Sequence, residues 1–149
     1  MTDYNAPLQD IRYVLDELVG MADIAQLPGY GDATPDLVGP VLEEAAKFAG
    51  ETLAPLNRVG DEEGAVFENG MVRTPQGFRD AYALFAEGGW NSVPFDPKHG
   101  GQGLPWSLAT ALQEMWASAN LSFTHCPMLT QGAIELLQNH GTPAQRADY

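Results

Sequence analysis

The stretch Asp96-Pro97-Lys98-His99-Gly100-Gly101-Gln102-Gly103-Leu104-Pro105 lies between two amphipathic helical patterns. Its three glycines within four positions allow the backbone to turn tightly and to approach a neighbour closely, because each can adopt a positive φ without a Cβ penalty. Pro105 then suits the start of a helix. The stretch therefore predicts a tight turn that connects two helices.

Helical spacing continues on the C-terminal side of this loop. Apolar residues repeat at three- and four-residue intervals over 108–116 and again over 128–137. We expect a break between these two helices over 120–127, and an end to the second helix at His140-Gly141. A further helix begins at Thr142-Pro143 but has room for about one and a half turns, so the sequence looks cut short.

On the N-terminal side, the strongest helical pattern covers 34–53. Pro40 has to lie in the first turns of this helix, or the helix begins near Pro40, and Pro55 is expected to end it. The segment 66–72 carries an Asn-Gly pair between apolar residues, which is typical of a two-residue hairpin. The segment 74–87 predicts another amphipathic helix, closed by two glycines.

The first residues form a pattern of their own. Residues 8–19 predict a short amphipathic helix that stops at Gly20, and 21–33 contains turn residues without periodicity. We therefore divide the chain into an N-terminal extension, 1–33, and a helical domain, 34–149. The fold class is all-α: a helical bundle of about five to six helices with a small hairpin or extended turn.

The composition excludes several classes of partner. Twenty acidic residues against seven basic ones give 149 residues a net charge of −13. This charge repels nucleic acids and anionic membrane surfaces, and no apolar run is long enough to span a membrane. The acidic run 61–63 is expected to be a solvated connector after a helix. One cysteine, Cys126, and the absence of a signal-peptide pattern favour a soluble, reducing compartment, the cytoplasm.

Three features of the sequence are candidate sites. The glycine loop could cradle a phosphate before a helix, but its spacing fits neither the dinucleotide fingerprint nor the P-loop, so a structural turn is the better interpretation. The three histidines lack the spacing of a helical metal site, and no metal is predicted. His125-Cys126 could form a nucleophile and base, but adjacent side chains usually diverge, and Cys126 is expected to be a small core residue.

Two carboxylates and three aromatic residues remain. Glu114 and Glu135 lie within apolar helical stretches and could be proton acceptors, but a polar flank is the better interpretation for both. The three tryptophans are Trp90, Trp106 and Trp116. We expect them to anchor the core or an interface, and the alternative is an aromatic platform for a flat ligand.

Several segments, in this order and spacing, resemble the N-terminal domain of acyl-CoA dehydrogenases. They are Leu53-Ala54-Pro55-Leu56-Asn57-Arg58 with Asp61 and Gly64, then Gly89-Trp90, Val93-Pro94, His99-Gly100-Gly101-Gln102-Gly103, and Gly132-Ala133-Ile134 through Gly141. The stretch from Gly141 to Tyr149 looks like the family's segment before its middle β-domain. The opening Tyr4-Asn5-Ala6-Pro7-Leu8 through Leu15 resembles the N-terminal extension of a longer subgroup, which contains 3-methylmercaptopropionyl-CoA dehydrogenase-like enzymes.

The resemblance implies an FAD-dependent enzyme. In the family, a glutamate takes the α-proton of an acyl-CoA thioester, the β-hydride passes to the flavin, and electrons leave through electron-transfer flavoprotein. The resemblance implies that the domains supplying most flavin contacts and this glutamate would lie beyond residue 149. No catalytic residue is therefore assigned, the cofactor-binding residues are unknown, and FAD is not expected to bind this fragment tightly. The complete enzyme is expected to be a homo-oligomer.

The resemblance also implies one wall of the acyl pocket. In the family, the break between the two helices before the β-domain faces the tail of the substrate. Matching back from Gly141 places Phe123, Thr124, His125 and Met128 there. Packing within the bundle is the alternative for these residues.

We therefore expect an N-terminal domain fragment of an FAD-dependent acyl-CoA dehydrogenase that is inactive alone. Two other hypotheses stay open at this point: a non-enzymatic acidic helical module that binds a partner, and an acyl-CoA or lipid-binding bundle without redox chemistry.

Overall fold

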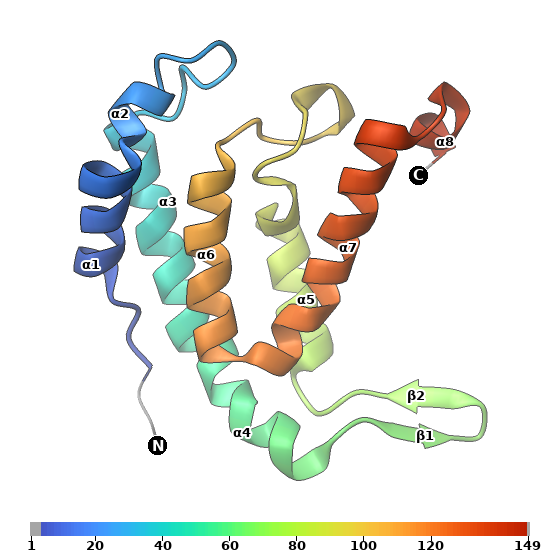
Figure 1. The fold of residues 1–149 in the computed structure, drawn as a ribbon. Helices are drawn as coiled ribbons and strands as arrows, with labels where there is room; N and C mark the ends of the chain where they lie inside the picture. The colour runs from blue at the N-terminus through green and yellow to red at the C-terminus, as the bar shows by residue number, and fades with distance from the viewer. Residues whose placement is uncertain (1–3, 149) are drawn as a thin grey trace.

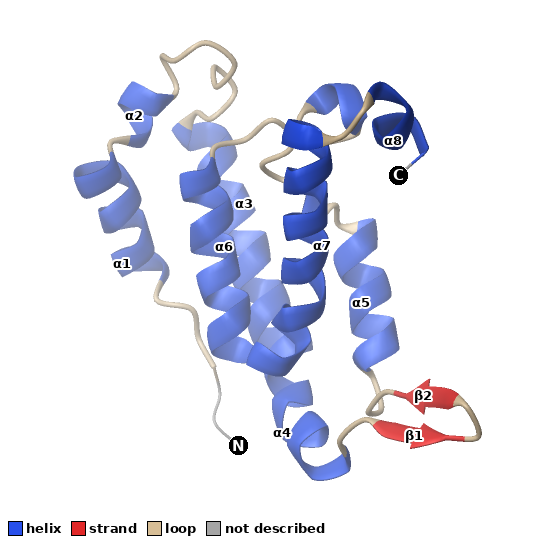
Figure 2. Ribbon diagram, turned by 45° about the vertical axis from the view of Figure 1, so that its right-hand side comes forward, coloured by secondary structure: helices blue, strands red, loops and turns tan. Residues whose placement is uncertain are grey.

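Apolar side chains at helical spacing form the buried faces of an all-α bundle, shown in Figure 1. The computed structural model describes residues 4–148. The elements are α1 (Leu8–Tyr13), α2 (Met21–Ile24), α3 (Pro35–Phe48), α4 (Ala54–Glu63), β1 (Val66–Glu68), β2 (Met71–Arg73), α5 (Phe78–Glu87), α6 (Trp106–Ala119), α7 (Leu121–His140) and α8 (Pro143–Asp148). The predicted all-α class is confirmed, and Figure 2 shows how little of the chain is strand.

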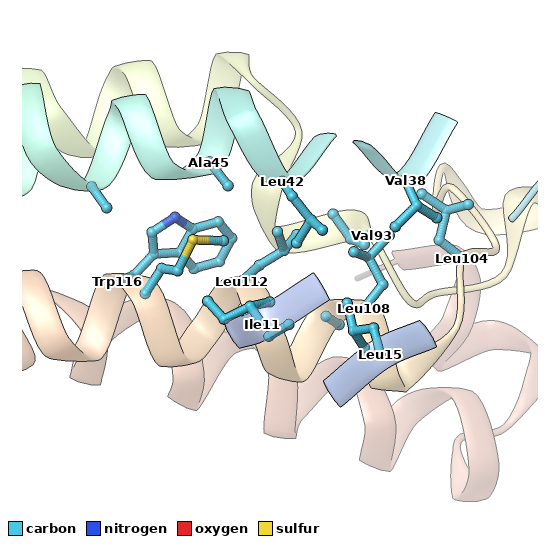
Figure 3. Packing of buried hydrophobic residues seen from close by; sticks show 14 of the residues in the cluster. Ile11, Leu15, Val38, Leu42, Ala45, Val93, Leu104, Leu108, Leu112 and Trp116 are labelled. Carbon is cyan, nitrogen blue, oxygen red and sulfur yellow. The ribbon is translucent and has the colours of Figure 1, made fainter. Parts of the chain in front are cut away.

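The centre of the core lies between α3 and α6. Leu42 of α3 meets Leu108 and Leu112 of α6, and all three side chains are at most 1% exposed. Ile11 of α1 and Leu15 of the π-helical turn that follows it, Val14–Val19, pack on the same cluster, as Figure 3 shows. Because full burial of a leucine contributes about 1.5–3 kcal/mol, this layer is a main source of stability. The N-terminal segment shares the core with the helices after residue 33, and the boundary placed there stays a prediction.

An aromatic cluster fixes α5 against α6 and α7. The ring of Phe85 meets Trp116 edge-on at 4.9 Å and Phe123 at 5.8 Å between centroids. Trp90 meets Trp116 at 5.6 Å. Edge-to-face pairs at these distances add roughly 0.5–1.5 kcal/mol each beyond burial. The cluster thus holds the first turns of α7 in place and confirms that Trp116 anchors the core.

The segment from Pro35 to Glu63 is helical throughout, so the predicted end at Pro55 is wrong. A π-helical turn, Ala49–Leu53, lies between α3 and α4. This turn resets the hydrogen-bond ladder, so that Pro55 lies in the first turn of α4, where a missing N–H costs little. Pro40 lies in the second turn of α3, which agrees with the first of the two predicted alternatives.

Three smaller expectations are also corrected. Residues 61–63 form the last turn of α4 rather than a connector, although all three are exposed. The expected connector 21–33 contains the short helix α2. The first helix ends at Gly20 as predicted, but it closes with a π-helical turn that leaves Leu18 71% exposed.

The hairpin is confirmed in detail. Asn69 and Gly70 have φ values of 53° and 78°, as a type I′ turn requires, and Phe67 pairs with Val72 across the strands. Figure 1 shows the hairpin projecting from the end of the bundle where α4 meets α5. Phe67 and Val72 are 74% and 66% exposed. The bundle therefore carries an arm with an apolar surface.

Candidate functional site

The predicted acyl-pocket residues lie on the first two turns of α7, and the structure divides them between two faces. Phe123 and Thr124 are each 3% exposed and belong to the buried side of the helix. His125 and Met128 are exposed, and the helical repeat places them on the opposite side from Phe123. The role of all four in an acyl pocket stays a prediction.

Asn120 determines where α7 begins. Its backbone is extended, its Oδ1 accepts a hydrogen bond from Phe123 N at 3.0 Å, and it is fully buried. Its Nδ2 donates to the carbonyl of Leu53 at 3.1 Å, which ties the junction of α6 and α7 to the start of α4. The predicted break over 120–127 is therefore wrong. The break is confined to Asn120, because an N-cap asparagine starts the next helix at once.

Pro127 lies inside α7 and is buried. A proline here removes one backbone hydrogen bond, which explains why the sequence favoured a longer break. Side chains at neighbouring positions bond to the carbonyls one turn earlier: the Thr124 hydroxyl donates to Asn120 O, and the Thr130 hydroxyl reaches Cys126 O at 3.4 Å. Packing against the core then keeps the helix continuous.

The exposed face of α7 forms an apolar stripe. His125 Nδ1 donates to the Leu121 carbonyl at 2.9 Å, which leaves Nε2 free to accept a hydrogen bond from solvent or a ligand. Met128 is 42% exposed. Three leucines that the sequence reasoning did not assign share this face: Leu121, Leu129 and Leu136, at 59%, 72% and 61% exposure. Their spacing of seven and eight residues is the signal that could have found them.

The glycine loop is a structural turn, as the sequence favoured. The N–H groups of Gly101, Gln102 and Gly103 donate to backbone carbonyls of residues 92–96. A Cβ atom on Gly101 would lie 2.0 Å from the carbonyl oxygen of Phe95, so this position accepts only glycine without a backbone shift. Because these three donors already have partners, the loop does not offer them to a phosphate or to a flavin.

The remaining candidates are on the surface. Glu114 and Glu135 are exposed, which confirms a polar flank for both. Cys126 is also exposed, so its assignment to the core was wrong; helical spacing places it between the two faces of α7. Within residues 4–148 no group of three or more His, Cys, Asp or Glu side chains could hold a metal ion. None of the helices in this part of the chain is long and apolar enough to cross a membrane.

Tyr4 carries the one resolved pKa shift in the described residues. Burial raises the pKa of its phenol, the Glu114 carboxylate raises it further, and the nearby Ser118 hydroxyl lowers it. The hydroxyl oxygen is buried without a hydrogen bond of ordinary geometry. The shift follows from the partial burial of Tyr4 beside Ser118 and Glu114 of α6.

Comparison with known proteins identifies the family. The acyl-CoA dehydrogenase N-terminal domain matches residues 40–149, which is most of the chain. The chain therefore belongs to the acyl-CoA dehydrogenase family.

Two curated proteins are similar to nearly the whole chain. Over 98% of its length the chain is 41% identical to the 3-methylmercaptopropionyl-CoA dehydrogenase of Ruegeria pomeroyi, of which it covers 25%. It is 26% identical, again over 98% of its length, to a broad-specificity linear acyl-CoA dehydrogenase of Mycobacterium tuberculosis, of which it covers 24%. The chain thus spans about a quarter of the length of the curated relatives it matches.

Proposed function

We propose that this chain is the N-terminal helical part of an FAD-dependent acyl-CoA dehydrogenase. The complete protein would catalyse α,β-dehydrogenation of an acyl-CoA thioester, pass electrons to electron-transfer flavoprotein and assemble as a homo-oligomer, whereas residues 1–149 would be inactive alone. The observation that carries the proposal is the 41% identity to 3-methylmercaptopropionyl-CoA dehydrogenase over nearly the whole chain. A thioester with a short, slightly polar tail is therefore the first substrate to test.

The exposed face of α7 supports this proposal. Its apolar side chains are exposed to solvent on the longest helix of the bundle, and the Leu129 side chain is 72% exposed. A stripe of this kind indicates a surface that another part of the protein or a ligand covers. We propose that His125, Met128 and Leu129 contact the acyl tail from this face, while Phe123 and Thr124 support the helix from beneath.

The cofactor would be held elsewhere. FAD supplies the hydride acceptor in such a reaction. The glycine loop in this chain does not provide phosphate donors, because its N–H groups are used within the turn. The contribution of residues 1–149 would be to shape the acyl side of the cavity and to exclude water from it.

Steady-state oxidation of acyl-CoA thioesters of different tail length by the complete protein tests the proposal. Leu129→Ser should raise KM for the preferred thioester by about tenfold, because the loss of a leucine contact with a buried tail costs roughly 1.5 kcal/mol or more. Leu18→Ser is the matched control, since Leu18 is equally exposed, at 71%, but lies at the end of the first helix. If the two variants have the same KM and kcat, the exposed face of α7 does not contact the acyl tail.

Comparison of the complete protein with residues 1–149 expressed alone distinguishes the three hypotheses. Residues 1–149 expressed alone should neither bind flavin nor oxidise a thioester. Tight acyl-CoA binding by these residues alone would favour a lipid-binding bundle. Failure of the complete protein to oxidise any thioester would favour a non-enzymatic helical module.

A further inference from the structure

An apolar cavity lies at the end of the bundle that carries the hairpin, between the hairpin, α5 and the first turns of α7. Its volume is about 590 Å³, within the usual range for small-molecule sites. The residues that matter for what it could bind are Val72, Phe78, Arg79, Tyr82, Phe123 and Cys126.

One wall of this cavity is aromatic and firmly held. The Phe123 ring lies 6.2 Å from Phe78 and 6.4 Å from Tyr82 between centroids, and Phe123 itself is packed on Phe85. Val72 of the hairpin also lines the cavity. Because aromatic rings packed in this way offer a large apolar area that is already ordered, an apolar group could bind with little reorganisation.

The charge around the cavity favours an anion. Arg79 is the one charged residue among those that line it, and no acidic residue lines it, in a chain with twenty acidic residues. Within the described part of the chain, both ion pairs involve other arginines, Arg12 and Arg58, so Arg79 has no carboxylate within 4.0 Å. A guanidinium beside an apolar wall matches a planar carboxylate.

We propose that this cavity binds an apolar carboxylate, with its chain or ring against Phe78 and Phe123 and its carboxylate at Arg79. The site is distinct from the outer face of α7, because Phe123 and His125 point to opposite sides of that helix. The inference does not depend on the acyl-CoA dehydrogenase activity.

Cys126 provides a direct readout, since it is the one cysteine of the 149 residues, is exposed, and lines the cavity. Decanoate is the probe. The rate of Cys126 alkylation by neutral iodoacetamide is measured on the purified complete protein, and the peptide that carries Cys126 is followed by mass spectrometry. We expect saturable protection by decanoate, with decanol about three- to fivefold weaker because it lacks the charge.

Two variants sharpen the test. Arg79→Gln should weaken protection by decanoate about three- to fivefold and leave decanol unchanged. Lys98→Gln is the matched control: it removes the same charge from the glycine loop, which Figure 1 places at the opposite end of the bundle from the hairpin, and should leave both ligands unchanged. Ala65→Trp, at an exposed position that lines the cavity, should abolish protection while the helical content stays the same.

Three results would overturn the proposal. The first is a Cys126 that is already unreactive in the ligand-free protein, because another part of the protein or a second copy then covers the cavity. The second is protection by decanoate and decanol to the same extent in every variant. The third is protection that survives Ala65→Trp.

Discussion

The substitution Asn120→Ala tests whether one buried side chain joins three helices. In the native chain its Oδ1 accepts from Phe123 N at 3.0 Å and its Nδ2 donates to Leu53 O at 3.1 Å. Loss of the helix cap costs about 1 kcal/mol, and loss of the second buried hydrogen bond costs about 1 kcal/mol more. We therefore expect the free energy of unfolding to fall by about 2 kcal/mol.

Urea unfolding followed by circular dichroism measures this change. With an m-value near 2 kcal/mol/M, the midpoint should fall by about 1 M while m stays the same. Asn139→Ala is the matched control, because the Asn139 side chain is exposed and bonds only within α7, to Glu135. Its effect should stay within about 0.5 kcal/mol.

A second variant separates the two hydrogen bonds. Asn120→Asp keeps the cap acceptor but places a carboxylate oxygen against the Leu53 carbonyl, so it should destabilise the chain more at pH 7 than at low pH, where the protonated acid can donate. If Asn120→Ala costs no more than Asn139→Ala, the Asn120 side chain does not join the helices.

The other predictions concern Tyr4 and three glycines. In the folded chain the pKa of the Tyr4 phenol lies above its ordinary value of 10.0. Its contribution to stability is therefore complete below pH 10 and is lost as the pH rises through the folded-state pKa. Tyr4→Phe should reduce this alkaline loss of stability, which urea unfolding at a series of pH values measures. Gly101→Ala should cost at least about 3 kcal/mol, since its Cβ would meet the Phe95 carbonyl, whereas Gly31→Ala, with open space around it, should be nearly neutral by the same assay. Gly132→Ala, in the middle of α7 with nothing within 4 Å, should raise the thermal midpoint through a gain of about 0.5–1 kcal/mol.

Periodicity was enough to predict most helices, because a bundle needs one apolar stripe per helix and little else. The hairpin was equally predictable from the sequence, since the Asn69-Gly70 pair adopts positive φ values at low cost. The two prolines were misread for a common reason. A local rule treats Pro55 and Pro127 as breaks, whereas a π-helical turn before Pro55 and core packing around Pro127 keep both helices continuous.

The site residues depended on the family resemblance rather than on the helical pattern. Matching back from Gly141 placed Phe123, Thr124, His125 and Met128 on one wall of an acyl pocket, with packing in the bundle as the alternative. A continuous helix turns by about 100° per residue, so neighbours in the sequence must face different sides. Phe123 and Thr124 are buried, whereas His125 and Met128 lie on the exposed stripe, and the role of all four in an acyl pocket stays a prediction.

The position of Asn120 therefore decides more than the end of one helix. If residue 121 occupied this anchoring site instead of residue 120, every side chain of α7 would shift by one position, which is about 100° around the helix. Met128 and Leu129 would then face different neighbours. Asn120 prevents this by bonding to Leu53 on one side and to Phe123 on the other, in a site with no exposure to solvent. A buried polar residue that satisfies its hydrogen bonds in one register alone specifies that register. The outer face of α7 is thus set from inside the bundle, by a residue that does not touch that face.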